Sequence, residues 1–194
     1  MHDPLLGGLA HCRELDGWEI RWEAHGDYRH WCSQIRPNDF NEKFIAVCLF
    51  NPGSLKGDGA NLRKDTTLRI LREVFESTDY GCLVVNLFDR ATPKPPELFS
   101  VWTERDRPNC PLVYPLLSNV IVASILAYGD YENHPDGQKG VEIKARIALL
   151  ETWRAGFKSL DSHRNASGTP MHVIRWQIEG LKETVAQSLS DFRV

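Results

Sequence analysis

The sequence lacks the motifs with which small domains bind zinc. It has no Cys-x-x-Cys pair, no His-Glu-x-x-His helix and no cluster of Cys and His residues, which are the common spacings of zinc ligands. Its five cysteines are an odd number and lie far apart in the chain, so they do not outline a disulfide-rich secreted domain. We therefore expect a reduced, intracellular protein with no metal site and no cofactor.

A net positive charge is also missing. The formal charge is −3 at pH 7, whereas a protein that covers nucleic acid needs many Lys and Arg contacts to phosphates. A local basic cluster does lie around the start of one expected helix. It consists of Arg63, Lys64, Arg69 and Arg72. The negative net charge favours a small ligand, or a single base flipped out of a DNA strand, over a broad DNA-binding surface.

No apolar run is long enough to span a bilayer, and the residues after Met1 lack the basic segment and apolar core of a secretory leader. Internal repeats and low-complexity tracts are absent as well. A chain of 194 residues can bury a core without disulfides or a structural metal. We expect a single cytoplasmic α/β domain over residues 1–194 with no membrane contact. Residues 1–43 are expected to form an N-terminal edge strand and extension.

The sequence does contain short apolar runs separated by amphipathic segments. The runs at residues 44–50 and 82–85 show no polar alternation, which is typical of strands covered on both faces. Further apolar runs at residues 120–126 and 171–174 are interpreted in the same way. Because strands and helices alternate, we expect a three-layer α/β sandwich with a mainly parallel central sheet of about four strands.

The expected helices have apolar residues at helical spacing. One begins after Asp65, which can cap it, and ends near residue 79. A brief helix is expected around residues 97–102, an amphipathic helix over residues 141–157 and a closing helix around residues 178–189. Proline-rich loops separate the second apolar run from the third.

The N-terminal region has a different pattern. Trp18, Ile20 and Trp22 alternate with polar neighbours, as in a half-exposed edge strand. Arg29 and Trp31 follow in a segment whose sequence indicates no clear form.

The first two apolar runs each end in an asparagine. Asn51 closes the first run and Asn86 closes the second. Because parallel strands end at one edge of a sheet and ligands bind beyond that edge, the two residues should lie at one rim. An asparagine amide offers both a donor and an acceptor, so it can recognise the edge of a nucleobase.

Several short motifs follow one another along the chain. They are Asn51-Pro52-Gly53-Ser54, Asp65-Thr66-Thr67-Leu68-Arg69, Tyr80-Gly81, Val84-Val85-Asn86-Leu87-Phe88, Arg90-Ala91-Thr92 and Gly168-Thr169-Pro170-Met171-His172. In this order they resemble the DUF1643 proteins, a bacterial and phage family with no settled activity. The resemblance covers most of residues 28–176, and the pairing of Val-Asn-Leu-Phe with Arg-Ala-Thr is its most specific part.

The order of these motifs is also similar to that of the uracil-DNA glycosylase fold. The loop at residues 51–53 resembles the Asn-Pro-Gly loop of the mismatch-specific uracil glycosylases, whose asparagine orients the catalytic water. The resemblance implies that Asn51 positions a nucleophile and that His172 stabilises the leaving base. It also implies that Asn86 hydrogen-bonds the base and that Phe88 stacks on it. This is an analogy of fold, which does not establish an activity.

An amide cannot take a proton from water as a carboxylate can, so a general base must come from elsewhere. Asp65 and Asp89 are the nearby candidates, and we select Asp65 together with Asn51 and His172 as the catalytic set. The other expected ligand-binding residues lie at the same strand ends. They are Pro52, Gly53, Ser54, Arg69, Asn86, Phe88, Arg90, Tyr128 and Gly129.

Each of these residues also has a purely structural interpretation. Asn51 and Asn86 can bond the backbone of turns, and Asp65 can act only as a helix cap. Phe88 belongs to a residue type that is usually buried. His172 lies in an apolar run and can be a hydrogen-bonded core residue.

Three functions stay open on this basis. The leading one is binding of a nucleobase, nucleoside or nucleotide, free or flipped from single-stranded DNA, with cleavage of an N-glycosidic bond as the reaction. The second is a non-catalytic module of the same fold that binds a nucleotide or a protein partner. The third is a phosphate-ester hydrolase that uses Asp65 or Asp89 with a metal.

Overall fold

The computed structural model describes most of the chain. The described residues are 10–25, 28–36, 43–53, 59, 62–92, 94–101, 119–131, 137–160, 163–178 and 180–192.

The described elements alternate between strands and helices after the first three strands. The strands are β1 (Ala10–Leu15), β2 (Trp18–His25), β3 (Tyr28–Ile35), β4 (Phe44–Leu49), β5 (Gly81–Asn86), β6 (Ile121–Leu126) and β7 (Lys158–Leu160). The α-helices are α1 (Thr66–Phe75), α2 (Pro95–Val101), α4 (Gly137–Arg154) and α5 (Leu181–Ser190), and the 3-10 helices are η1 (Leu62–Lys64) and η2 (Val173–Gln177).

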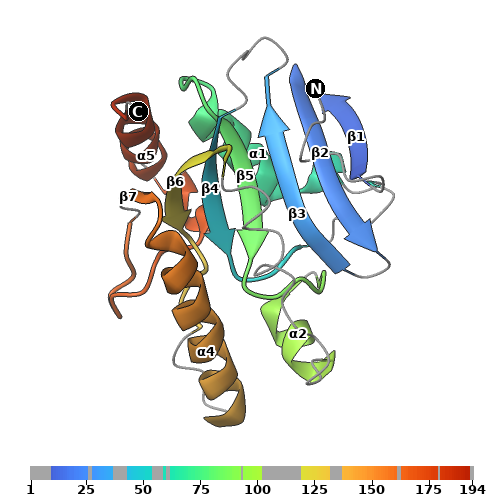
Figure 1. Cartoon of the computed structure of the whole chain (residues 1–194), viewed down its shortest axis with the longest axis vertical. Coiled ribbons are helices and arrows are strands. Elements are labelled where there is room, and N and C mark those ends of the chain that lie inside the picture. The colour runs from blue at the N-terminus through green and yellow to red at the C-terminus, as the bar shows by residue number, and fades with distance from the viewer. Residues whose placement is uncertain are drawn as a thin grey trace.

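The seven described strands form one mixed sheet in the order β1-β2-β3-β5-β4-β6-β7 (Figure 1). Strands β5, β4, β6 and β7 are parallel to one another. Strands β1, β2 and β3 form an antiparallel meander, and β3 joins it to β5 in antiparallel pairing. The α/β class and the parallel core are therefore confirmed, whereas the expected size of about four strands is wrong because the N-terminal meander extends the sheet.

Both faces of the parallel core are covered. Ile45, Val47 and Leu49 of β4 pack in one cluster with α1, η2 and α5. Phe44 and Cys48 point the other way and pack with α2 and α4. Figure 1 shows α4 in front of the sheet and α1 behind it. This arrangement explains why β4 is apolar throughout, since alternate residues enter two different cores.

The N-terminal strands correct the expectation of an edge strand. Trp18, Ile20 and Trp22 lie on β2 and are buried, but β2 is flanked by β1 on one side and β3 on the other. The alternation of apolar and polar residues correctly indicated one buried face. It could not reveal neighbours on both sides, because the alternation reports on the faces of a strand and not on its edges.

The fourth expected strand is also corrected. The run at residues 171–174 forms no strand, because His172 caps η2 and Val173 begins it. Val173 is buried whereas Ile174 is 49 % exposed. The fourth parallel strand is instead β7, which pairs with β6. A short apolar run cannot by its period distinguish a strand from a helical turn.

The helices agree more closely with the sequence. Asp65 caps α1 through a hydrogen bond from the Leu68 N–H at 3.0 Å. The helix ends at Phe75, earlier than expected, because Thr78 accepts and donates hydrogen bonds in the turn that leads to β5. None of the described helices has both the length and the apolar character needed to cross a membrane. The four described cysteines are free, and only Cys12 is exposed.

Candidate functional site

A cavity of about 280 Å³ lies at the carboxyl end of β4. The described residues that line it are Arg29, Leu49, Asn51, Gly53, Asp65, Thr67, Thr92, Tyr131, His172, Ile174 and Arg175. They come from the start of β3, from the loops after β4, β5 and β6, from the first turn of α1 and from the segment around the start of η2. All three residues selected as catalytic from the sequence, Asn51, Asp65 and His172, are among them.

Asn51 joins the loop after β4 to the loop after β5. Its Nδ2 donates to the Pro52 carbonyl at 2.8 Å, to the Thr92 carbonyl at 3.3 Å and to Thr92 Oγ1 at 2.9 Å. Two of these acceptors are carbonyl oxygens, so the amide nitrogen must face them and Oδ1 is directed away from the Thr92 loop. Asn51 therefore holds the turn through its nitrogen and retains its oxygen as an acceptor.

Asp65 combines a structural contact with a place in the cavity wall. Its Oδ1 accepts the Leu68 N–H of α1. Its Oδ2 lies 3.8 Å from Nη1 of Arg29, and both side chains are buried. A Cβ built on Gly53 would lie 3.8 Å from the same Oδ2, so the loop after β4 passes close to this carboxylate.

Arg29 is one of the lining residues that the sequence did not predict. It lies on β3, where its backbone N–H donates to the Asp89 carbonyl at 2.8 Å, and its side chain is only 2 % exposed. A buried guanidinium carries a large desolvation cost unless it is paired and hydrogen-bonded. The sequence contains one signal for Arg29, a charged residue among aromatic and apolar neighbours. The place of Arg29 in the fold, however, depends on the pairing of β3 with β5.

His172 is held in a defined tautomer. The Ile174 N–H donates to its Nδ1 at 3.2 Å. A ring nitrogen that accepts a hydrogen bond carries no proton, so the neutral ring has its proton on Nε2. Burial lowers the pKa of His172 below its ordinary value of 6.5, and the negative charge of Asp65 opposes this shift only in part. The cavity is thus lined by a neutral imidazole with an N–H donor.

The segment that carries His172 is tied to the loop after β6. The Gly129 N–H donates to the Pro170 carbonyl at 3.1 Å, and Thr169 Oγ1 donates to Asp130 Oδ1 at 3.1 Å. Gly129 has φ +85, and a Cβ at this position would lie 3.6 Å from Cβ of His172. The contact with His172 is of ordinary length, so the positive φ and the closer approach to Tyr131 at 3.2 Å are what favour glycine here.

The aromatic wall of the cavity is Tyr131. Its ring centroid lies 4.3 Å from that of Phe50, and burial raises the pKa of its hydroxyl. Phe88, which we expected to stack on a base, is buried in the same core, on the α4 side of the sheet. The guanidinium of Arg146 covers it, with its central carbon 4.1 Å from the ring centroid. Among the described residues, Tyr131 and not Phe88 lines the cavity.

Asn86, Tyr128 and Gly129 lie near this edge of the sheet but are not among the described residues that line the cavity. Asn86 is opposite Leu49 in the β4–β5 register, so it shares the rim with Asn51 as expected. It is 1 % exposed. Tyr128 packs in the core with α4. Pro52 is buried beneath the rim, where its carbonyl accepts the Thr92 N–H at 3.1 Å.

The remaining predicted binding residues lie elsewhere. Arg90 donates through Nη1 to the Val101 carbonyl at 3.2 Å, and its guanidinium lies over the ring of Tyr28 at 5.8 Å. Arg69 is exposed on α1 and pairs with Glu73. Ser54 lies outside the described residues.

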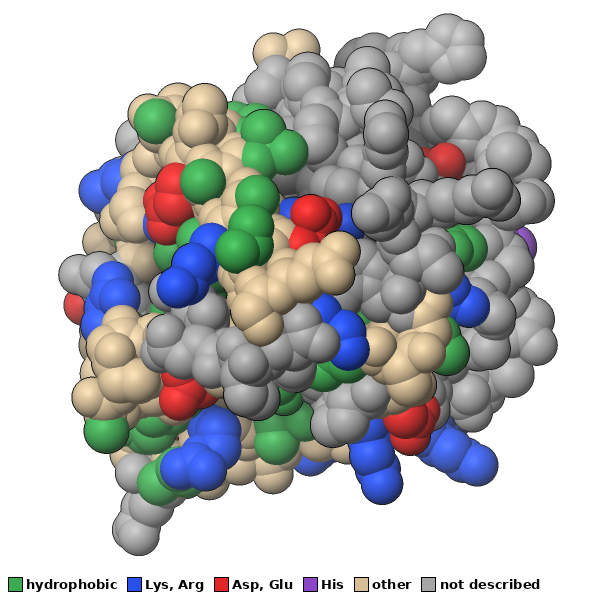
Figure 2. All heavy atoms as spheres, turned by 90° about the horizontal axis from the view of Figure 1, so that it is seen from below, with side chains coloured by type: hydrophobic (Ala, Val, Ile, Leu, Met, Phe, Trp, Pro, Cys, Tyr) green, Lys and Arg blue, Asp and Glu red, His purple; other side chains and the backbone are tan. Residues whose placement is uncertain are grey.

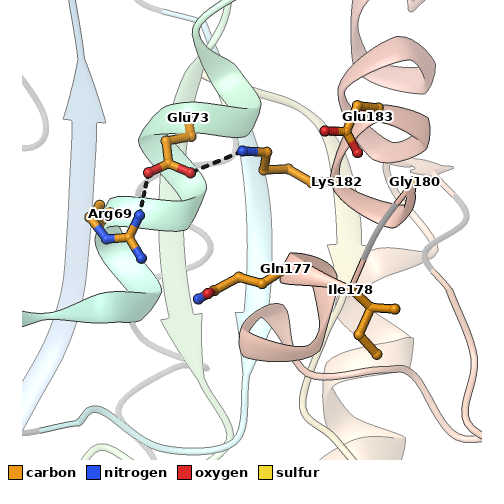
Figure 3. A pocket seen from close by; sticks show the side chains of 7 residues that line it. All are labelled: Arg69, Glu73, Gln177, Ile178, Gly180, Lys182 and Glu183. Carbon is orange, nitrogen blue, oxygen red and sulfur yellow. Dashed lines mark hydrogen bonds and ion pairs between the residues drawn. The ribbon is translucent and has the colours of Figure 1, made fainter.

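Arg69 belongs to a second, larger hollow of about 510 Å³ between α1, η2 and α5. Figure 3 shows Arg69 and Lys182 reaching Glu73 from opposite sides. Partial burial raises the pKa of Glu73, but hydrogen bonds from Lys182 and Arg69 outweigh this effect and lower the pKa overall. These charges satisfy one another at the surface, so we place the candidate site in the smaller cavity, where Arg29, Asp65 and Thr92 are buried.

The surface at the carboxyl end of the parallel strands is shown in Figure 2. Lys and Arg side chains are interspersed with Asp and Glu side chains there, and the described part of this face shows no continuous basic stripe. Within the described residues, no three His, Cys, Asp or Glu side chains gather as a metal site requires.

The comparisons with known proteins give a family and no further relative. No curated protein and no solved structure matches the chain significantly, so the likeness to the uracil-DNA glycosylase fold stays a prediction. A family model with the description "Protein of unknown function (DUF1643)" matches residues 28–173. This range includes every described lining residue of the cavity except Ile174 and Arg175. The chain therefore belongs to the DUF1643 family.

Proposed function

We propose that the chain binds a nucleobase or nucleotide in the cavity at the end of β4 and cleaves its N-glycosidic bond. The observation that supports this most directly is the tautomer of His172, whose Nδ1 accepts a backbone N–H. The N–H on Nε2 is then a fixed donor for a base that leaves with negative charge. A neutral donor suits this task, because it stabilises the developing anion without a prior proton transfer.

The other groups of the cavity have complementary roles in this reaction. Water attacks the anomeric carbon and loses a proton to the Asp65 carboxylate, while the bond between that carbon and the base nitrogen breaks. The electron pair of that bond stays with the base, and the His172 N–H donates a hydrogen bond to the anionic base. Asn51 orients the water through Oδ1, since its Nδ2 is engaged by Thr92.

The base is held against the aromatic wall. Tyr131 lines the cavity and provides a face for stacking, which is how enzymes commonly hold an extruded or free base. The volume of about 280 Å³ is just below the range of roughly 300–1,000 Å³ that holds drug-sized ligands. A single nucleotide unit fits this size better than a longer chain does.

The proposal follows the uracil-DNA glycosylase resemblance, with one change. It is supported by the loop after β4 and the segment around His172, which both line one cavity. In our proposal Asn51 and Tyr131 contact the ligand, and Asn86 supports the rim from below. The ligand is a free nucleotide or a base flipped from single-stranded DNA, in keeping with the interspersed charges of the surface in Figure 2.

The proposal is tested by incubating the full chain with nucleosides, nucleotides and single- and double-stranded oligonucleotides that carry normal, deaminated and modified bases. Free base is then measured by mass spectrometry. The decisive variants keep local structure: His172→Asn retains an acceptor for the Ile174 N–H, and Asp65→Asn retains an acceptor for the Leu68 N–H. His11→Asn, at the exposed end of the sheet on β1, is the matched control.

We expect the wild-type protein to release one base. This activity should be lost in His172→Asn and Asp65→Asn and retained in His11→Asn. Release that persists in His172→Asn would show that the histidine does not stabilise the leaving base. Absence of release with every substrate would remove the catalytic part of the proposal.

A non-catalytic binding module is the second candidate, and the contacts of Asp65 favour it. One carboxylate oxygen accepts the Leu68 N–H and the other faces Arg29, so the group has a complete structural role without catalysis. This candidate predicts that a ligand raises the melting temperature while no free base forms. Asn51→Ala would abolish the shift under this candidate.

A further inference from the structure

The buried guanidinium of Arg29 has fewer contacts than its burial requires. Its Nε and Nη1 are buried and have no hydrogen-bond acceptor among the described residues. The nearest carboxylate oxygen, Oδ2 of Asp65, is 3.8 Å away, beyond the usual hydrogen-bond range of about 2.7–3.2 Å. A charged donor left without acceptors destabilises a fold by about 1–3 kcal/mol or more, so such a group indicates a missing partner.

The same cavity wall includes a second set of donors at the start of α1. In any α-helix the first N–H groups have no intrahelical acceptor. Asp65 accepts the N–H of Leu68 with its side chain and that of Arg69 with its carbonyl. In the described part of the chain no acceptor faces the N–H groups of Thr66 and Thr67, and Thr67 lines the cavity. Helix N-termini with free N–H groups favour anions.

The charges of the described lining also favour an anion. Arg29 and Arg175 are cationic, Asp65 is the one carboxylate, and His172 is neutral because burial lowers its pKa. Both arginines line the cavity, and Arg175 is exposed whereas Arg29 is buried. The lining thus offers one exposed and one buried guanidinium to an anion.

We propose that the cavity binds a phosphate group, so that its ligand is a nucleotide and not a free base or nucleoside. Arg29, Arg175 and the first turn of α1 hold the phosphate, while His172 and Tyr131 contact the base. The assignment of the base rests on the proposed function, but the assignment of the phosphate does not. Phosphate is common to a free mononucleotide and to a nucleotide within a DNA strand, and the experiment separates these sources.

The test measures binding to the full chain by isothermal titration calorimetry at constant ionic strength. The probes are inorganic phosphate, nucleosides, the matching nucleoside 5′-monophosphates and single-stranded tetranucleotides. The variants are Arg175→Gln, which changes an exposed residue, and Arg29→Lys, which keeps the charge but lacks the planar set of donors. Lys144→Gln, on the exposed face of α4, removes the same charge at a distance from the cavity.

We expect a monophosphate to bind at least about tenfold more tightly than its nucleoside, a difference of about 1.4 kcal/mol, and inorganic phosphate to compete with it. Arg175→Gln and Arg29→Lys should reduce this difference, and Lys144→Gln should leave it unchanged. If only the tetranucleotides show the gain, the phosphate site is supported and its source is a DNA strand.

Equal affinity for nucleoside, monophosphate and tetranucleotide, without competition by inorganic phosphate, would overturn the phosphate site and leave the proposed base pocket standing. Binding of inorganic phosphate that Arg175→Gln weakens, without affinity for any nucleoside or nucleotide, would support the phosphate site and overturn the proposed function. If Arg29→Lys fails to fold, titrations of the wild-type protein and of Arg175→Gln still decide whether the cavity binds phosphate.

Discussion

Nδ2 of Asn51 donates to Oγ1 of Thr92 at 2.9 Å, and this bond closes the rim of the cavity between the loops after β4 and β5. Thr92 Oγ1 in turn donates to the Lys94 carbonyl at 3.2 Å. The threonine of the Arg-Ala-Thr motif therefore orients the asparagine of the Asn-Pro-Gly loop. This contact gives a physical reason for the occurrence of both motifs in one chain.

Replacement of Thr92 tests this link. Thr92→Val removes the Oγ1 acceptor, but Nδ2 of Asn51 keeps the Pro52 and Thr92 carbonyls. We therefore expect a loss of about 0.5–1.5 kcal/mol in the free energy of unfolding and weaker ligand binding, because the amide is less firmly held. Urea denaturation and calorimetry measure the two effects. Thr92→Ser keeps the hydroxyl, so its stability and ligand affinity should match those of the wild-type protein. Equal losses in Thr92→Val and Thr92→Ser would show that Thr92 Oγ1 does not orient Asn51.

Asp65 has two stabilising contacts that substitutions can separate. Asp65→Asn keeps an acceptor for the helix cap but removes the charge opposite Arg29, whereas Asp65→Ala removes both. Loss of an N-cap side chain costs about 1 kcal/mol, and a buried charge without its counterion costs about 3–5 kcal/mol. Both variants should therefore be less stable in urea denaturation, with Asp65→Ala less stable than Asp65→Asn by about 1 kcal/mol. Equal stability of the two variants would show that the cap contributes nothing.

The parallel half of the fold could be predicted from the sequence because its strands are local apolar runs. Phe44–Leu49 and Gly81–Asn86 are buried on both faces, and this burial leaves a continuous apolar pattern. The loops that follow such strands must share one rim. For that reason Asn51 and Asp65 could be placed near one another before their contacts were known. His172 was placed with them through the resemblance, because the strand expected at residues 171–174 does not form.

Arg29 could not be predicted in the same way. Its position depends on the antiparallel pairing of β3 with β5, in which Cys32 lies opposite Val84. Pairing between strands so distant in sequence is not encoded in the local pattern of either one. The burial of Phe88 has a similar origin, because only the packing of α4 and Arg146 on that side of the sheet encloses its ring.

The lowered pKa of His172 gives the fold a specific dependence on pH. In the unfolded chain a histidine has its ordinary pKa of about 6.5, whereas burial lowers the pKa in the folded state. Below pH 6.5 the unfolded state therefore binds more protons, and the free energy of unfolding falls until the pH reaches the folded pKa. The contribution of neutral His172 to the free energy of unfolding is therefore complete above the unfolded pKa. It is lost as the pH falls toward the folded pKa.

This dependence is measured by urea denaturation between pH 7.5 and pH 5 in the unchanged protein and in His172→Asn. The slope from one histidine is at most about 1.4 kcal/mol per pH unit. The difference between the two proteins should therefore diminish as the pH falls. Base release should also decline, because protonation of Nδ1 breaks the bond from the Ile174 N–H. Parallel stability curves would contradict the assignment of His172 as a buried neutral ring.

Gly129 offers the sharpest test of how closely the β6 loop approaches the site. Its φ is +85, and a Cβ would lie 3.2 Å from Cε2 of Tyr131 and 3.6 Å from Cβ of His172. Gly168 has the same φ of +85, but a Cβ there would meet no atom within 4 Å.

Both Gly129→Ala and Gly168→Ala should lose about 1–2 kcal/mol of stability through the left-handed backbone. Only Gly129→Ala displaces the Tyr131 ring, so it alone should weaken ligand binding in calorimetry. If Gly168→Ala weakens binding equally, backbone strain accounts for the effect, and the cavity does not depend on close contact between Gly129 and Tyr131.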